Sequence, residues 1–316
     1  MDGPLKNLLV VDLTRVLVGP YCTMMLSDMG ARVIKVESPG IGDDSRKFGP
    51  FVKDNSAYFM SLNRGKESIA LNLKDEEDKK IFLNILSKAD ILVENFKPGT
   101  LEKWGFGWKD MCKKFPKLIY ASASGFGQTG PLKELPAYDM VVQGMGGLMS
   151  VTGQPNSEPT RVGTSIGDIT AALFTTIGIN AALYDREKTG KGMFIDVSML
   201  DCQIAILENA IARYLSKNEI PKPMGSRHPS IAPFEAFKTK DSYIIIAAGN
   251  DKLFEKLCNV LELNELPQNE KFKSNSSRCE NMNDLKLIME EKLKSLNTKD
   301  WIQKMEKDKI PCGPIF

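Results

Sequence analysis

The feature that most constrains the fold is a pair of apolar runs near the N-terminus, separated by the length of one short helix. Residues 8–13 and 32–37 have the composition of buried strands, and Gly19-Pro20 opens a helix that ends near Gly30. Two parallel strands need a crossover of about this length to connect them. The start of the chain therefore predicts a strand–helix–strand unit.

The same pattern continues along the first two hundred residues, with further strands expected at 69–73, 91–94, 118–122 and 194–197. We therefore predict an α/β fold with a Rossmann-like, mostly parallel sheet in a large domain, residues 1–200. A linker helix and connection follow at 201–225, because the Pro- and Gly-bearing stretch 221–229 interrupts the periodicity. A smaller α+β domain is expected at 226–316, with two short strands and Lys-rich amphipathic helices.

Composition excludes several classes of protein. Forty-two basic against 40 acidic residues give a net charge of +2, which is no broad field for nucleic acid or an anionic membrane. The six cysteines are scattered and there is a single histidine, so no disulfide framework or metal site is expected. The start of the chain lacks the pattern of a secretory signal, and the apolar stretch 169–184 is too short for a membrane span. We expect a cytoplasmic protein with 169–184 as a core helix.

Two short glycine motifs suggest chemistry, and each has an unfavourable context. Residues 125–130 match G-x-G-x-x-G, but Pro131 and Pro136 interrupt the helix that a dinucleotide site requires. Residues 163–167 match the G-x-S-x-G nucleophile elbow, with Asp201 and His228 following in hydrolase order, but polar residues and Pro159 precede the motif where a buried strand is needed. A structural turn is the favoured interpretation of the first motif, and a chance match that of the second.

Asp168 follows the second motif and precedes the apolar helix. As a structural residue it would be an N-cap that accepts hydrogen bonds from free backbone N–H groups. As a functional residue it would be a carboxylate kept ionised by the helix terminus, with Gly167 leaving room for a substrate. A carboxylate can attack a thioester when the site desolvates it and stabilises the oxyanion. The residues alone leave both interpretations open.

Taken together, the chain resembles the class III CoA-transferase family (CaiB/BaiF type), which includes formyl-CoA:oxalate and succinyl-CoA:glutarate transferases and the related α-methylacyl-CoA racemases. The resemblance covers nearly the whole chain. It is carried by residues 11–20, 33–37, 93–99 and 124–131 and by Gly167-Asp168.

The resemblance implies that Asp168 is the nucleophile, forming first a mixed anhydride with the donor acid and then an aspartyl-CoA thioester. Coenzyme A or acyl-CoA would be a substrate, with no permanently bound cofactor and no metal. The partners implied are an acyl-CoA and a small carboxylic acid, with no nucleic acid or membrane. The residues expected to bind CoA are Arg15, Leu17, Val18, Leu71, Asn72, Leu73, Lys74, Asn95, Phe96, Lys97, Lys103, Ala137, Tyr138 and Asp139.

Departures from the family pattern bear on the substrate and leave alternatives open. Tyr138 stands where the racemases place a proton-transferring histidine, which favours transfer over racemisation because a phenol holds its proton at neutral pH. Leu17 and Ser38 replace a glutamine and an arginine of the oxalate enzymes, and residues 225–230 replace their glycine-rich loop, so oxalate is disfavoured. The sequence resembles the succinyl-CoA:glutarate branch more closely than the oxalate enzymes. Arg227 or His228 would then meet a far carboxylate, or His228 would be structural.

The resemblance also implies an interlocked homodimer, with a C-terminal segment that returns to the large domain. We expect that segment to be absent, since the sequence ends at Phe316. An inactive CoA-binding protein is therefore the alternative from another functional class.

Overall fold

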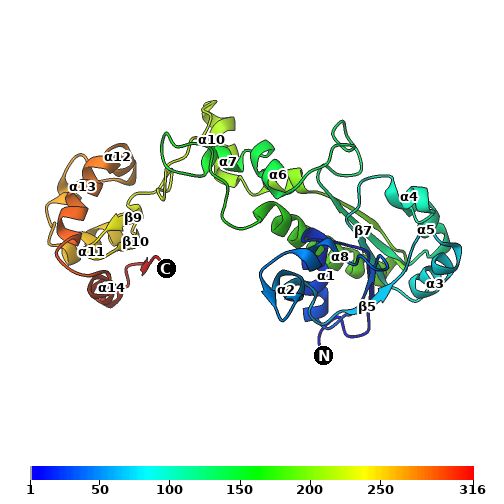
Figure 1. Cartoon of the computed structure of the whole chain (residues 1–316). Coiled ribbons are helices and arrows are strands. Elements are labelled where there is room, and N and C mark those ends of the chain that lie inside the picture. The colour runs from blue at the N-terminus through cyan, green and yellow to red at the C-terminus, as the bar shows by residue number, and fades with distance from the viewer. Residues whose placement is uncertain (1) are drawn as a thin grey trace. The chain divides into compact units, whose positions relative to one another are not determined.

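A computed structural model describes residues 2–316, which divide into two compact units (Figure 1). Unit 1 holds the described residues up to Val151 together with Pro159–Pro221, and unit 2 holds Thr152–Glu158 and Lys222–Phe316. The helices that follow Ser198, which we expected in a linker, belong to unit 1. The sequence-based boundaries at 200 and 225 stay a prediction.

The core of unit 1 is a six-stranded sheet in which every strand is parallel to its neighbours, so the predicted α/β fold with a Rossmann-like sheet is confirmed. Its order is β5-β2-β1-β6-β7-β8, which places the first strand in the middle of the sheet. The strands are β1 Leu9–Asp12, β2 Arg32–Glu37, β5 Glu67–Ala70, β6 Ile91–Glu94, β7 Ile119–Ser124 and β8 Phe194–Ser198. The strand predicted at 69–73 thus starts two residues and ends three residues earlier.

Helices cover both faces of this sheet, because successive side chains of each strand point to opposite sides. Val10 packs with one cluster and Val11 with another. On one face lie α1 Val18–Asp28 and α8 Ile166–Thr189. On the other lie α3 Glu76–Leu86, α4 Thr100–Trp104 and α5 Trp108–Lys114 (Figure 1). Both faces are buried, which explains why these strands are near-continuous apolar runs.

The remaining elements of unit 1 connect the strands. Between β2 and β5 lie η1 Asp44–Lys47, the small hairpin β3 Phe51–Val52 and β4 Asn55–Ser56, and α2 Ala57–Asn63, a stretch for which the sequence showed no period. Before α8 lie α6 Asp139–Met145 and α7 Leu148–Val151, and after β8 lie α9 Met199–Ala205 and α10 Glu208–Lys217. The linker helix expected within 201–225 is therefore two helices, and no Gly or Pro lies at the break between them.

Helix α8 is long and apolar enough, by length and composition, to cross a bilayer. It also packs on β7, β8, α1 and α9. A core helix has the same length and composition, so these properties alone do not make it a membrane span.

Unit 2 has its own core and an antiparallel sheet of order β11-β10-β9. Its central charged residue is Arg278, which is fully buried and donates to the carbonyls of Ala232, Phe272 and Gly249 and to the carboxylate of Asp251. The elements are β9 Phe234–Lys238, β10 Tyr243–Ala247, α11 Asp251–Leu261, η2 Leu266–Gln268, α12 Asn275–Glu280, α13 Met282–Leu293, α14 Thr298–Lys307 and β11 Cys312–Pro314.

Candidate active site

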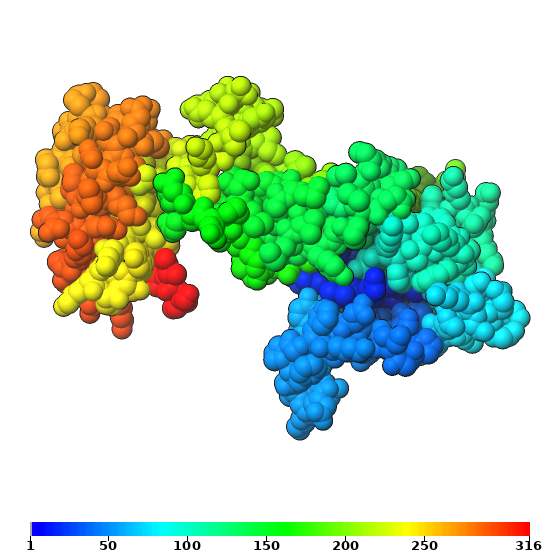
Figure 2. Space-filling model, turned by 45° about the horizontal axis from the view of Figure 1, so that its top comes forward, coloured from blue at the N-terminus to red at the C-terminus, as the bar shows by residue number. Residues whose placement is uncertain are grey.

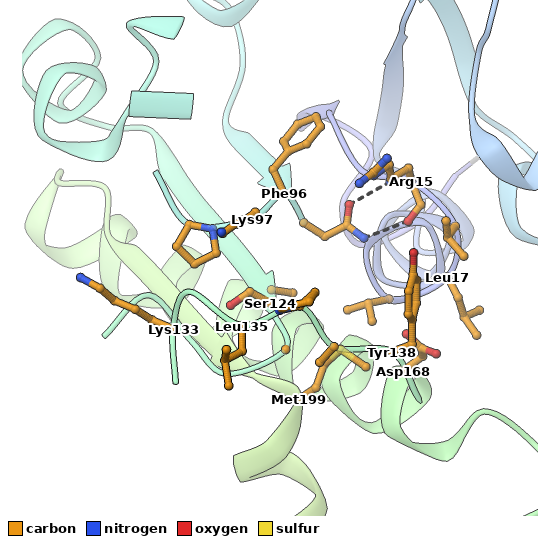
Figure 3. A pocket seen from close by; sticks show the side chains of 18 of the residues that line it. Arg15, Leu17, Phe96, Lys97, Ser124, Lys133, Leu135, Tyr138, Asp168 and Met199 are labelled. Carbon is orange, nitrogen blue, oxygen red and sulfur yellow. Dashed lines mark hydrogen bonds between the residues drawn. The ribbon is translucent and has the colours of Figure 1, made fainter. Parts of the chain in front are cut away.

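The sheet order predicts where a ligand should bind. The chain moves outward from β1 in one direction through β2 and β5 and in the other through β6, β7 and β8, so the switch point lies between β1 and β6. Ligands of open parallel sheets bind at the carboxyl ends of the strands at such a point. A cavity of about 210 Å³ lies there, lined by the segments after β1, β6 and β7 and by Asp168 of α8 (Figure 3). A neighbouring cavity of about 600 Å³ shares Arg15, Phe96 and Lys97 with it.

The segment after β1 is held against the segment after β6 by Asn95. The Asn95 amide accepts from the Arg15 N–H at 2.9 Å and donates to the Arg15 carbonyl at 2.8 Å (Figure 3). Both ends of that amide are therefore engaged in positioning the loop. The Arg15 guanidinium lies 3.0 Å from the Asp44 carboxylate in an exposed ion pair. Next to it, Val16 has a φ of +67°, which is a rare backbone conformation for a β-branched residue.

A buried set of ion pairs stabilises this unusual loop. Asp43 accepts a hydrogen bond from the Val16 N–H at 3.1 Å, and its other oxygen lies 2.9 Å from Lys35 Nζ. Lys35 Nζ also donates to the Thr14 carbonyl at 2.7 Å. At the end of β1, Asp12 pairs with Lys66 at 3.0 Å. Burial by itself would raise the pKa of Asp12, but the two lysines and hydroxyl donors hold it well below its usual range.

Asp168 lies in the first turn of α8, inside the helix and after the N-cap residue, Ser165. The N-cap interpretation of Asp168 is therefore wrong, and its carboxylate has no hydrogen-bond partner among the described residues. Burial, and then the charge of Asp139, raise the pKa of Asp168 to about 7. The expected effect of the helix terminus on its ionisation is thus outweighed, because desolvation disfavours the charged form more strongly.

Asp139 and Gln143 of α6 fix the backbone that precedes Asp168. One Asp139 oxygen accepts from the Gly167 N–H at 2.8 Å, and the other accepts from the Gln143 amide at 2.7 Å. The Gln143 carbonyl in turn accepts from the Val162 N–H at 2.9 Å. A Cβ on Gly167 would lie 2.7 Å from Val142 and 2.9 Å from Asp139. Gly167 therefore allows α6 and α8 to approach closely, and the space for a substrate that we expected beside it stays a prediction.

The structure brings most of the predicted site residues to the two cavities. Those that line the smaller one are Arg15, Leu17, Val18, Asn95, Phe96, Lys97, Ala137, Tyr138 and Asp168. Leu71, Asn72, Leu73 and Lys74 line the larger one, as does Ser38. Lys103 and Asp139 are not among the described lining residues of either cavity. Their predicted contacts with a ligand stay a prediction.

Several residues of the site were missed from sequence. Ser124 ends β7, and Met199 begins α9 after β8, so both follow from the rule that sites form at the carboxyl ends of parallel strands. Lys133 and Leu135 come from the loop that follows the glycine motif. Tyr58 of α2 is half-buried, and burial together with the nearby charge of Asp168 raises its pKa to about 12. Nothing in the sequence around Tyr58 indicates this position.

Arg227 and His228 are engaged within unit 2. Arg227 lies 2.9 Å from the buried carboxylate of Glu235 and donates to Asn283 at 3.0 Å. The His228 ring stacks on Phe234 with centroids 5.3 Å apart, and its Nδ1 accepts from the Ser230 N–H at 3.1 Å. These contacts match the structural interpretation of His228.

Neither glycine motif has the context its function needs. In the described chain, residues 152–164 form no strand, so Ser165 is not at a strand-to-helix elbow. After β7, residues 125–138 form no helix, and Gly125 is instead required because a Cβ there would lie 2.4 Å from the Cβ of Ala137. Among residues 2–316 there is no cluster of three His, Cys, Asp or Glu side chains suited to a metal ion.

The chain is similar to known proteins over almost its full length. The sequence model of CoA-transferase family III matches residues 5–316. The acetyl-CoA:oxalate CoA-transferase of Acetobacter aceti is 49% identical, over 99% of this chain and 81% of that protein. The human succinyl-CoA:glutarate CoA-transferase is 44% identical, over 99% of this chain and 72% of that protein. Among solved structures, a CAIB/BAIF family protein from Brucella suis has a TM-score of 0.87 and 42% identity, over 100% of this chain and 85% of that one.

Proposed function

Because the chain belongs to CoA-transferase family III and is a CoA-transferase, we propose that it moves CoA between carboxylic acids through covalent intermediates on Asp168. The observation that carries this proposal is an unpartnered, largely buried carboxylate at the switch point of the sheet. A raised pKa accompanies a more basic carboxylate, which is a stronger nucleophile once it is ionised.

The proposed reaction conserves the energy of the thioester. An Asp168 oxygen attacks the thioester carbon of the donor, the C–S bond breaks, and CoA thiolate leaves a mixed anhydride. The thiolate then attacks the Asp168 carbonyl of this anhydride, which releases the donor carboxylate and forms an aspartyl-CoA thioester. The acceptor carboxylate attacks this thioester and expels the thiolate, which finally attacks the acceptor carbonyl of the second anhydride and frees Asp168. No net proton or phosphoryl transfer is needed.

The two cavities suit the two parts of CoA. The larger one offers Arg15, Lys74 and Lys97 for the phosphates, and the smaller one offers mostly apolar walls that lead to Asp168. Since Arg15 and Lys97 border both cavities, an extended molecule can enter through the first and reach into the second. We propose this course for acyl-CoA, which would be bound as a substrate and not as a permanent cofactor.

We propose a small dicarboxylate as the acceptor, since the relatives described above are named for oxalate and for succinate and glutarate. The expectation against oxalate rests on Leu17 and Ser38, which line the cavities, and on residues 225–230. A panel of labelled oxalate, succinate, glutarate and acetate, incubated with acetyl-CoA and succinyl-CoA, should show transfer to a dicarboxylate. Transfer to monocarboxylates alone would contradict the acceptor class.

We also propose that unit 1 pairs with a second copy of the chain. Leu173, Ile177 and Tyr184 lie on one face of α8 at helical spacing, and their side chains are 42%, 63% and 66% exposed. An apolar face of this kind is expected to be covered in solution. A cytoplasmic location stays a prediction.

Trapping tests the covalent mechanism directly. During incubation with acyl-CoA, hydroxylamine or borohydride should modify Asp168, and peptide mass spectrometry would locate the product. Asp168→Ala should fold, bind CoA and lose transfer by at least about 1,000-fold, because the reacting group itself is removed. An unmodified Asp168 in an enzyme that is turning over would contradict the mechanism.

A further inference from the structure

Ser124 is the last residue of β7, and its hydroxyl is buried without a partner. The side chain lines the smaller cavity and the residue is 8% exposed, yet its Oγ has no hydrogen-bond partner among the described residues (Figure 3). Ser122, two residues earlier on the same strand, is also buried, but its hydroxyl accepts from the Gln128 amide at 2.7 Å. The two serines differ in what faces them: protein for Ser122 and the cavity for Ser124.

An unpaired buried hydroxyl is costly, so such a group in a binding cavity indicates a ligand atom that pairs with it. The surroundings of Ser124 narrow the chemistry of that atom. The lining of the smaller cavity includes the apolar residues Ala123, Leu135, Pro136 and Met199. The cations of this lining, Arg15, Lys97 and Lys133, suit phosphates, whereas an uncharged hydroxyl suits a neutral polar group on an otherwise apolar chain.

The proposed course of CoA brings such a group here. Its phosphates lie at Arg15, Lys74 and Lys97 and its thioester at Asp168, so the pantetheine arm must cross the smaller cavity between them. That arm is apolar except for two amides. We propose that the Ser124 hydroxyl donates a hydrogen bond to an amide carbonyl of the pantetheine arm, and so positions the arm for attack at the thioester. This inference rests on the proposed function.

Calorimetric titration of two ligands tests it. CoA carries the arm, and 3′-phospho-ADP carries the same phosphates without it. Ser124→Ala should weaken CoA binding about three- to tenfold, the effect of one neutral hydrogen bond, and leave 3′-phospho-ADP binding unchanged. Ser124→Cys keeps the shape of the side chain with a slightly larger atom but replaces the hydroxyl with a weak donor, and should also weaken CoA binding.

Ser122→Ala is the matched control, because Ser122 is buried on the same strand and does not line the cavity. It should lower thermal stability and leave the ratio of the two affinities unchanged. If Ser124→Ala weakens both ligands equally, or neither, the role of Ser124 is wrong while the proposed function stands. If the wild-type chain binds no CoA, the proposed function fails and the role of Ser124 falls with it.

Discussion

Three buried carboxylates of unit 1 differ in their ionisation because their partners differ. Burial raises the pKa of Asp168 and of Glu94 to about 7 in each case, whereas Asp12, which is fully buried, has its pKa lowered. Asp12 lies against Lys66 and near Lys35, and the other two carboxylates have no cation that offsets their desolvation. A cationic partner, which sequence spacing does not reveal, thus decides whether a buried carboxylate keeps its charge.

Asp168→Asn should change how stability depends on pH. The folded-state pKa of about 7 lies above the ordinary aspartate value of 3.8, so the folded wild type retains a proton that the unfolded chain has lost between about pH 4 and 7. Wild-type stability therefore falls as pH rises through that window. The variant lacks this loss and should be more stable than the wild type at pH 8, by roughly 1–3 kcal/mol, and inactive. Urea unfolding at pH 5 and pH 8 measures the free energy of unfolding of both proteins. The same difference between variant and wild type at both pH values would contradict the prediction.

Glu94→Gln should separate the same stability effect from catalysis. Glu94 ends β6 and accepts a hydrogen bond from the Phe96 N–H at 2.7 Å. It is not among the described residues that line the two cavities. The amide oxygen can keep that hydrogen bond without the buried charge. We expect a gain in melting temperature at pH 8 that disappears at pH 5, with transfer retained within about threefold. A loss of transfer like that of Asp168→Asn would show that Glu94 takes part in the chemistry.

At the scale of elements, the position of Asp168 is set by how closely α6 and α8 approach. Asp139 of α6 accepts from the Gly167 N–H in the first turn of α8, and Gln143 accepts from the Val162 N–H before it. Gly167 has no Cβ to keep the helices apart. The loop after β1 is fixed in the same way from its neighbours, by Asn95 and by Asp43. The start of α8 and the loop after β1 are therefore each held in place by hydrogen bonds from neighbouring segments.

Gly167→Ala should damage this contact. The new Cβ would overlap Val142 and the Asp139 carboxylate, so the free energy of unfolding should fall by about 1–3 kcal/mol and transfer should fall more steeply than CoA affinity. Gly163→Ala is the control, since a Cβ there would meet nothing within 4 Å. Equal melting temperatures for the two variants would contradict the close approach.

Lys66→Met should show that the buried ion pairs hold the loop after β1. Lys66 Nζ reaches Asp12, the Pro20 carbonyl and the Asn63 amide oxygen at 2.8–3.0 Å. Removing it leaves Asp12 buried with fewer partners and should cost about 3–5 kcal/mol. Lys80→Ala removes an exposed pair with Glu77 and should cost less than about 0.5 kcal/mol. Chemical denaturation distinguishes the two, and a similar small loss from both would contradict the argument.

At the scale of the whole molecule, unit 1 and unit 2 each have a core of their own. In Figure 2 the earliest part of unit 1, in dark blue, lies recessed between two later parts, in light blue and green. The site of unit 1 is therefore assembled from segments far apart in sequence, and the α8 face lies outside that site.

Ile177→Glu should weaken self-association of the chain. The side chain is 63% exposed in the middle of the apolar α8 face, and a charge there would be buried without a partner on pairing. We expect light scattering to show a smaller mass for this variant than for the wild type. Leu287→Glu, which changes a 70% exposed residue of α13 in unit 2, should keep the wild-type mass. A monomeric wild type would contradict the pairing.

The sequence by itself determined the α/β fold, the parallel strands and the family, because apolar runs, glycine positions and ordered motifs are local properties of a chain. It also indicated the residues after β1 and β6 that line the cavities. Only the tertiary structure decided that Asp168 is no N-cap, that Gly167 serves a helix contact, that Ser124 lacks a partner where Ser122 has one, and that Tyr58 lies near Asp168. These four features depend on which groups the tertiary packing places beside each side chain. Positions in the sequence do not show which residues will be neighbours in the fold.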